Sequence, residues 1–161
     1  MELTTDIFLK GTAWNKAIDN LKNIFTPRTN YDIYMLCLAI GIMYDQRIEK
    51  PEEAGEDSKN VPRNVLNNND NGKLDFMFQA CILSTRTEEF TEEERLELAF
   101  GEKKDFKKLS FLTQFANYGV TKLVEKIGTS DLESMDQIKD FLFASVDGRN
   151  LEINPLSEEI F

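Results

Sequence analysis

The feature that most constrains the fold is a nearly unbroken apolar stretch, YDIYMLCLAIGIMY, over residues 31–44. Its apolar side chains do not keep to one side of a helix but cover almost the whole circumference. A helix of this kind is stable when it is buried at the centre of a domain. The sequence therefore predicts a central helix, capped by Asn30, with the other elements packed around it.

Periodic apolar segments on both sides predict the surrounding elements. A short strand is expected to end at Gly11, and Thr12 then caps a helix that runs to about Phe25. Thr91 with Glu94 three residues later forms a capping-box pattern. Further helices are expected over 73–87, after Thr91, within 106–128 and within 130–146. The predicted fold is mainly α: a single domain of five to six helices with a short N-terminal strand.

The composition changes between residues 45 and 72, where two Pro, two Gly and a run of Asn occur. We expect a mobile connection at 45–72, with VPRNVL docked on the surface. It lies inside one domain that spans 1–161, because neither flank is a plausible complete domain. The residues at 149–161 are expected to form an extended C-terminal tail.

Net charge and cysteine usage indicate the cellular compartment of the chain and the kind of partner it binds. The formal net charge is −10, so the surface as a whole repels nucleic-acid backbones. There is no apolar run of about 18 residues and no signal-peptide pattern at the N-terminus, so we expect no membrane association. Cys37 and Cys81 lie within apolar segments and are interpreted as reduced core thiols. Together these features predict a cytoplasmic protein with protein partners.

Catalytic constellations are scarce in this sequence. It contains no His, which excludes Ser–His and Cys–His nucleophilic pairs. Two isolated Cys cannot fill a zinc site, and the usual glycine-rich phosphate-binding patterns do not occur. We therefore expect no enzyme activity, no catalytic residues, no cofactor and no metal.

Carboxylates leave one alternative open, a metal-dependent nuclease. Six Glu residues lie within TEEFTEEERLE at residues 87–97, and an acidic pair on one helix face can hold a hard cation. The favoured interpretation is a solvated helix whose acidic first turn is stabilised by the helix dipole.

The sequence has one basic cluster, within EKKDFKKL. On a helix, Lys103, Lys104, Lys107 and Lys108 share one face. They form a candidate patch for binding phosphate or an acidic partner. We expect direct contact with nucleic acid only through this patch. The favoured alternative is that these lysines balance the acidic run before them.

A second candidate site interrupts the helix expected within FLTQFANYGVTKLVEKIG, residues 111–128. Asn117 and Gly119 are poor interior helix residues, and Gly costs roughly 1 kcal/mol there relative to Ala. Small residues let a second backbone approach a helix closely. The approaching element is either another helix of this chain, which we favour, or a partner bound by Phe115, Asn117, Tyr118 and Gly119.

Three segments together resemble a known family. They are YDIYMLCLAIGIMYDQRIEKP (31–51), LDFMFQACILSTRTEEFTEEE (74–94) and FLTQFANYGVTKLVEKI (111–127). Their order is similar to that of the small proteins called DNA phosphorothioation-associated protein 4, from bacterial defence islands. In that family the third segment reads like an aromatic-Ala-Asn-Gly-Gly run. Here Phe115, Ala116, Asn117 and Gly119 match it, and Tyr118 replaces the first Gly.

The resemblance covers roughly Thr4 to Ile127 and leaves out the C-terminal helix and tail. It implies a non-catalytic accessory or adaptor subunit of a bacterial anti-phage defence complex linked to DNA modification or DNA sensing. Its partners would be the other protein subunits of that system, and nucleic acid would be contacted only indirectly or through a local basic patch.

The opening strand–helix–helix also looks like a ribbon-helix-helix unit, which suggests a DNA-binding regulator as a further alternative. Residues 1–44 contain four basic and four acidic residues, a net charge of zero, and two of the acidic ones, Glu2 and Asp6, lie in the strand. Direct DNA reading is therefore disfavoured. Use of the strand for a homodimer or for docking is the better expectation.

Overall fold

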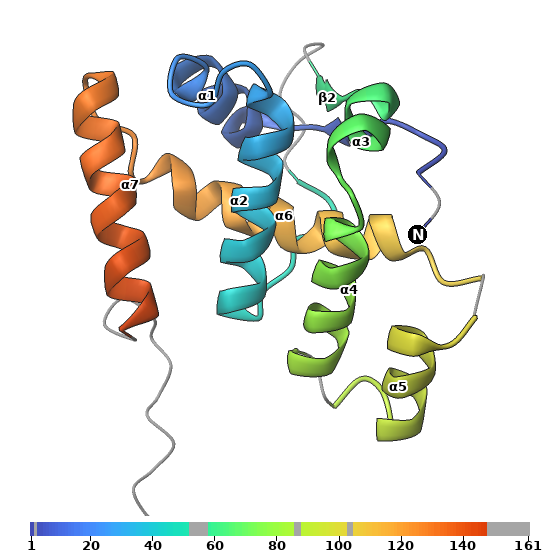
Figure 1. Cartoon of the computed structure of the whole chain (residues 1–161). Coiled ribbons are helices and arrows are strands. Elements are labelled where there is room, and N and C mark those ends of the chain that lie inside the picture. The colour runs from blue at the N-terminus through green and yellow to red at the C-terminus, as the bar shows by residue number, and fades with distance from the viewer. Residues whose placement is uncertain (2, 52–57, 86–87, 103–104, 148–161) are drawn as a thin grey trace, which may run out of the picture.

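The computed structural model describes residues 1, 3–51, 58–85, 88–102 and 105–147. The prediction of a mainly helical chain is confirmed, but the count of five to six helices is wrong, because the described residues form seven (Figure 1). The additional helix is α3 (Arg63–Asn69), which follows Pro62 inside the predicted connection. Its Asn-rich sequence favours a loop, but full burial of Leu66 outweighs that local preference.

A two-stranded sheet lies beside these helices. β1 (Ile7–Leu9) runs antiparallel to β2 (Lys59–Val61), with Ile7 opposite Val61. Ile7, Leu9 and Val61 face the core, and Phe8 faces solvent. The Asp6 carboxylate accepts hydrogen bonds from the Asn60 amide and from the backbone N–H of Arg63, both at 2.8 Å. β1 thus pairs with a strand of its own chain.

The central helix is confirmed as α2 (Thr29–Tyr44), which buries residues from Tyr31 to Gly41. Its predicted cap is wrong: Arg28 occupies the cap position, and Asn30 instead donates to the backbone carbonyl of Asn60 at 2.7 Å. The preceding helix, α1 (Thr12–Leu21), ends four residues before the predicted Phe25, and Gly11 rather than Thr12 is its N-cap residue.

Four further helices complete the fold: α4 (Lys73–Ser84), α5 (Glu92–Phe100), α6 (Lys108–Val124) and α7 (Asp131–Val146). The predicted capping box at the start of α5 is confirmed, since the Thr91 hydroxyl accepts from the N–H of Glu94 and the Glu94 carboxylate accepts from the N–H of Thr91. Ser130 caps α7 by accepting from the N–H of Glu133 at 3.2 Å.

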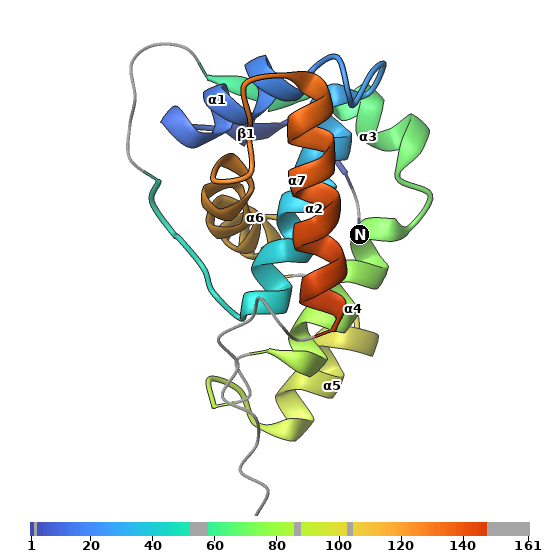
Figure 2. The ribbon, with the colours of Figure 1, turned by 90° about the vertical axis from the view of Figure 1, so that its left-hand side faces the viewer.

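The core forms where α2 crosses α6, the most extensive contact between any two elements. In Figure 1, α7 lies on one side of this crossing, and α4 and α5 lie on the other. The turned view in Figure 2 places α7 at the outer surface, in front of α2. None of the described helices combines the length and apolar character needed to cross a membrane.

Parts of the predicted connection pack on the core. Ile48 donates its backbone N–H to the carbonyl of Gln114 in α6 at 2.9 Å, and residues 59–69 form β2 and α3. Residues 52–57, in the middle of this connection, lie outside the described residues, as does the predicted tail at 149–161.

Candidate interaction surface

The helix interruption at Gly119 lies at the crossing of α2 and α6. A Cβ atom placed on Gly119 would be 1.7 Å from the backbone carbonyl oxygen of Cys37, and one placed on Gly41 would be 1.9 Å from that of Phe115. Each helix therefore presents a glycine to a carbonyl of the other, and the two backbones touch. This packing within the chain accounts for a glycine at position 119 without a partner.

Asn117 ties the same crossing to two other segments. Its side-chain oxygen accepts from the indole N–H of Trp14 at 2.9 Å, and its amide donates to the carbonyl of Ile48 at 3.1 Å. Only 6% of Asn117 is exposed, and Trp14 is fully buried. Asn117 thus satisfies a buried donor that water does not reach. Neither partner could be found from local sequence, since Trp14 lies 103 positions away.

The other two residues of the predicted partner site differ in exposure. Phe115 is fully buried, and its ring centroid lies 5.4 Å from that of Phe111. Tyr118 is half-buried, with its ring 5.7 Å from that of Tyr44 and 5.9 Å from the ammonium of Lys122. Of the four predicted residues, Tyr118 is therefore the one that remains accessible.

The predicted basic patch is only partly described. Lys103 and Lys104 lie outside the described residues, Lys107 is exposed just before α6, and Lys108 is the first residue of that helix. The ammonium of Lys108 lies 4.8 Å from the centre of the Phe78 ring, a cation–π contact. α6 therefore starts too late to place all four lysines on one face of it.

Lys107 and Lys108 border a cleft of about 970 Å³ between residues 4–8 and the first half of α6. Its lining mixes these lysines with the acidic residues Asp6, Glu49 and Glu102 and with hydroxyl and amide groups, so its charge favours no one ligand class. The described residues contain no group of three or more His, Cys, Asp or Glu side chains placed to hold a metal ion.

Both cysteines are confirmed as buried free thiols. Burial raises the pKa of Cys37 well above its usual value and that of Cys81 to about 11.

Since the thiolate is the reactive form, neither cysteine should react with Ellman's reagent at about pH 8 in the folded protein. Both should react after unfolding in denaturant. Rapid labelling of either thiol in the native protein would contradict this burial.

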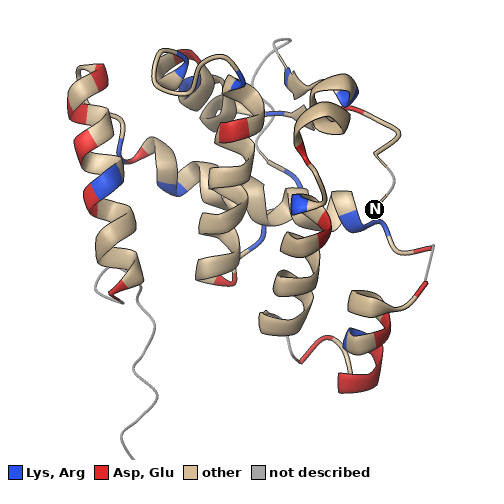
Figure 3. Cartoon of the chain, in the orientation of Figure 1, with Lys and Arg blue, Asp and Glu red and all other residues tan. Residues whose placement is uncertain are grey.

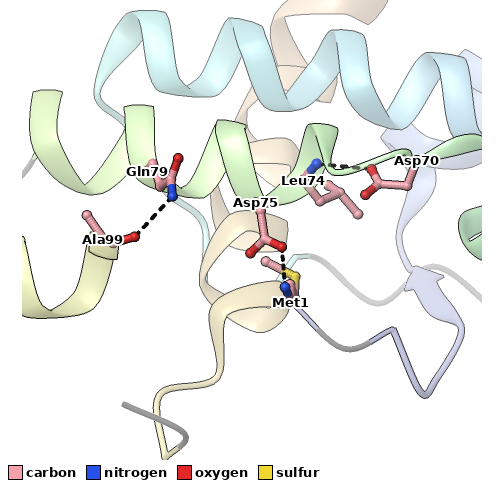
Figure 4. Close-up of polar contacts among 6 residues, drawn as sticks. All are labelled: Met1, Asp70, Leu74, Asp75, Gln79 and Ala99. Atoms are coloured by element: carbon pink, nitrogen blue, oxygen red, sulfur yellow. Dashed lines mark hydrogen bonds and ion pairs between the residues drawn. The ribbon is translucent and has the colours of Figure 1, made fainter. Parts of the chain in front are cut away.

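α4 and α5 pack against each other, and both carry exposed apolar side chains. The two helices are joined along their length by hydrogen bonds from the Gln79 amide to the carbonyl of Ala99 (3.2 Å) and from the Arg95 guanidinium to the carbonyl of Leu83 (3.2 Å). Figure 4 shows the first of these, together with the ion pair between the Met1 amino group and Asp75.

Four exposed hydrophobic side chains lie on these two packed helices. Phe76 is 67% exposed, Phe100 66% and Leu96 47%, and Leu83 is the fourth. Phe76 and Leu83 are seven residues apart on α4, and Leu96 and Phe100 are four apart on α5, so each pair shares one face of its helix. We call these four residues the α4–α5 face.

Carboxylates surround the α5 half of this face. Glu92, Glu93 and Glu97 are exposed on the same side of α5 as Leu96 and Phe100, and Figure 3 shows the acidic residues gathered on this helix and the loop before it. Within the part of the chain that is described, none of these three carboxylates forms an ion pair. The result is an apolar stripe with an acidic border.

α7 carries a second exposed apolar face. Its inner side buries Ile138 and Phe141, while Leu132, Met135, Phe143 and Val146 are exposed. The helix is thus apolar on its buried side and on part of its outer side, which exceeds what packing on the core requires.

The sequence indicates a solvated acidic helix at residues 87–97, an interpretation that omits the apolar side chains there. The sequence signal for an exposed apolar stripe on this helix was the pair Leu96 and Phe100, which lie four residues apart among glutamates. Local sequence did not reveal that the neighbouring helix α4 adds Phe76 and Leu83 to them.

Compared with protein-family models, with curated proteins and with solved structures, the chain matches none.

Proposed function

We propose that this chain is a non-catalytic accessory or adaptor subunit of a bacterial anti-phage defence complex, linked to DNA modification or DNA sensing. It works in the cytoplasm and binds other protein subunits of that system. The link to defence rests on the resemblance of three segments between Thr4 and Ile127 to the DNA phosphorothioation-associated proteins.

The observation that carries the adaptor role is the distribution of exposed hydrophobic side chains. Of the nine large hydrophobic residues that are exposed within the described part of the chain, eight lie on α4, α5 and α7. Single exposed hydrophobic residues are normal on a soluble protein, whereas groups bordered by charge are typical of protein–protein contact sites. Two groups of exposed hydrophobic residues on different sides of the core, one of them bordered by carboxylates, suit a subunit that bridges partners.

Co-purification from the native host tests this function. The protein is tagged at its chromosomal locus, and stably retained proteins are identified by mass spectrometry, with an untagged strain as the background. We expect products of neighbouring genes in stoichiometric amount, and we expect deletion of the gene to lower resistance to phage. A protein that elutes alone, in a host whose phage resistance does not change on deletion, would refute the proposal.

A further inference from the structure

We propose that the α4–α5 face binds a positively charged, amphipathic helix of a partner protein. This inference rests on the proposed adaptor function and names the chemistry of one partner. It concerns a surface distinct from the Asn117–Gly119 segment, which lies at the crossing of α2 and α6.

The apolar part of the face has the spacing that a helix can match. Leu96 and Phe100 are one turn apart on α5, and Phe76 and Leu83 are two turns apart on α4. The two helices pack against each other, so both pairs of exposed apolar side chains belong to one packed unit. An amphipathic helix covers such side chains with its own apolar residues, which repeat every three to four positions.

The charges around the face specify the sign of the charge that the partner helix must carry. Glu92, Glu93 and Glu97 border Leu96 and Phe100, and no described cation neutralises them. Lys or Arg side chains flanking the apolar stripe of a partner helix would pair with these carboxylates. Such complementary charges raise the association rate and fix the register of the bound helix.

The same charges disfavour three other occupants. An anionic membrane, a nucleic acid or the same face of a second copy would each place negative charge against the three glutamates. The net charge of −10 adds long-range repulsion to each of these encounters. Of these occupants, only a basic amphipathic helix makes favourable contacts with both the apolar side chains of the face and its acidic border.

The test uses a synthetic peptide of about 18 residues, long enough to form a helix on binding. Leu occupies one face, and Lys and Arg fill the other. A peptide of identical composition but scrambled order serves as the matched control, since it keeps the charge and loses the apolar face. Binding is followed by fluorescence anisotropy of the labelled peptide at about 0.15 M salt, where weak surface attraction is screened.

We expect the amphipathic peptide to bind at least about tenfold more tightly than the scrambled one. The double variant Leu96→Ser, Phe100→Ser should weaken binding about tenfold or more, since exposed anchors of this kind dominate affinity. The triple variant Glu92→Gln, Glu93→Gln, Glu97→Gln should weaken it too and reduce its dependence on salt. The double variant Leu132→Ser, Phe143→Ser on α7 should leave affinity within about twofold.

Three results would overturn the inference. The first is equal binding of the two peptides, and the second is a loss of binding in the α7 variant that matches the loss in the α5 variant. The third is binding to anionic vesicles, or self-association in analytical ultracentrifugation, that the Leu96→Ser, Phe100→Ser variant abolishes. Any of these would leave the adaptor function standing if neighbouring gene products still co-purify, so the two proposals fail separately.

Discussion

Replacing Gly119 with Ala should lower the free energy of unfolding by about 3 kcal/mol, the upper end of the usual range for overpacking. The added methyl group would fall 1.7 Å from the carbonyl oxygen of Cys37, a backbone atom that cannot swing aside as a side chain can. α2 and α6 would have to separate, which loosens the largest contact in the core. Denaturant unfolding followed by the emission of the single tryptophan, Trp14, gives the change directly.

The sign of this change is diagnostic, because Ala is the better helix former. At an open helix position, Gly→Ala would stabilise the protein by up to about 1 kcal/mol. Ser110→Ala, at an exposed position of the same helix, is the matched control and should change stability by less than about 0.5 kcal/mol. Gly41→Ala should resemble Gly119→Ala. A higher unfolding midpoint for Gly119→Ala would contradict the close crossing.

The second large effect is expected at Asn117. Asn117→Leu keeps the number and branching of the side-chain heavy atoms but removes the acceptor of the Trp14 indole N–H and the donor to the Ile48 carbonyl. Trp14 is fully buried, so its N–H would be left without any partner. A buried donor left unsatisfied costs about 1–3 kcal/mol, and we expect a loss of about 2–3 kcal/mol.

A double-mutant cycle separates this hydrogen bond from other effects at position 117. Trp14→Phe removes the N–H itself, so in that background Asn117→Leu should cost at least about 1 kcal/mol less than in the parent protein. Unfolding of these variants is followed by circular dichroism, since Trp14→Phe removes the fluorescent reporter. Additive losses in the double variant would show that the Trp14–Asn117 bond contributes nothing to stability.

The sequence reveals the elements whose signals are local. The all-round apolar character of residues 31–44 predicts α2, and the Thr91–Glu94 pattern predicts the start of α5, because both signals lie within the element itself. A glycine in an otherwise helical segment likewise points to a close backbone approach at Gly119, although the sequence does not identify the helix that approaches.

The features that escape prediction depend on distant contacts. α3 forms from an Asn-rich segment because Leu66 is buried, and Asn30 bonds to Asn60 instead of capping its helix. The partners of Asn117 come from α1 and from the segment before β2. The α4–α5 face requires two helices to lie side by side, so neither helix alone indicates it. In each case the missing information is tertiary.

Hydrogen exchange, measured on the free protein and on the complex purified with its partner, most directly tests the central claim that the Asn117–Gly119 segment packs the core while partners bind elsewhere. Amides at the centre of α6 should be strongly protected already in the free protein, because they lie in the most extensive contact between any two elements. Binding should slow exchange over Glu92–Phe100 and leave residues 115–121 unchanged. Slower exchange confined to residues 115–121, with α5 unaffected, would contradict the claim.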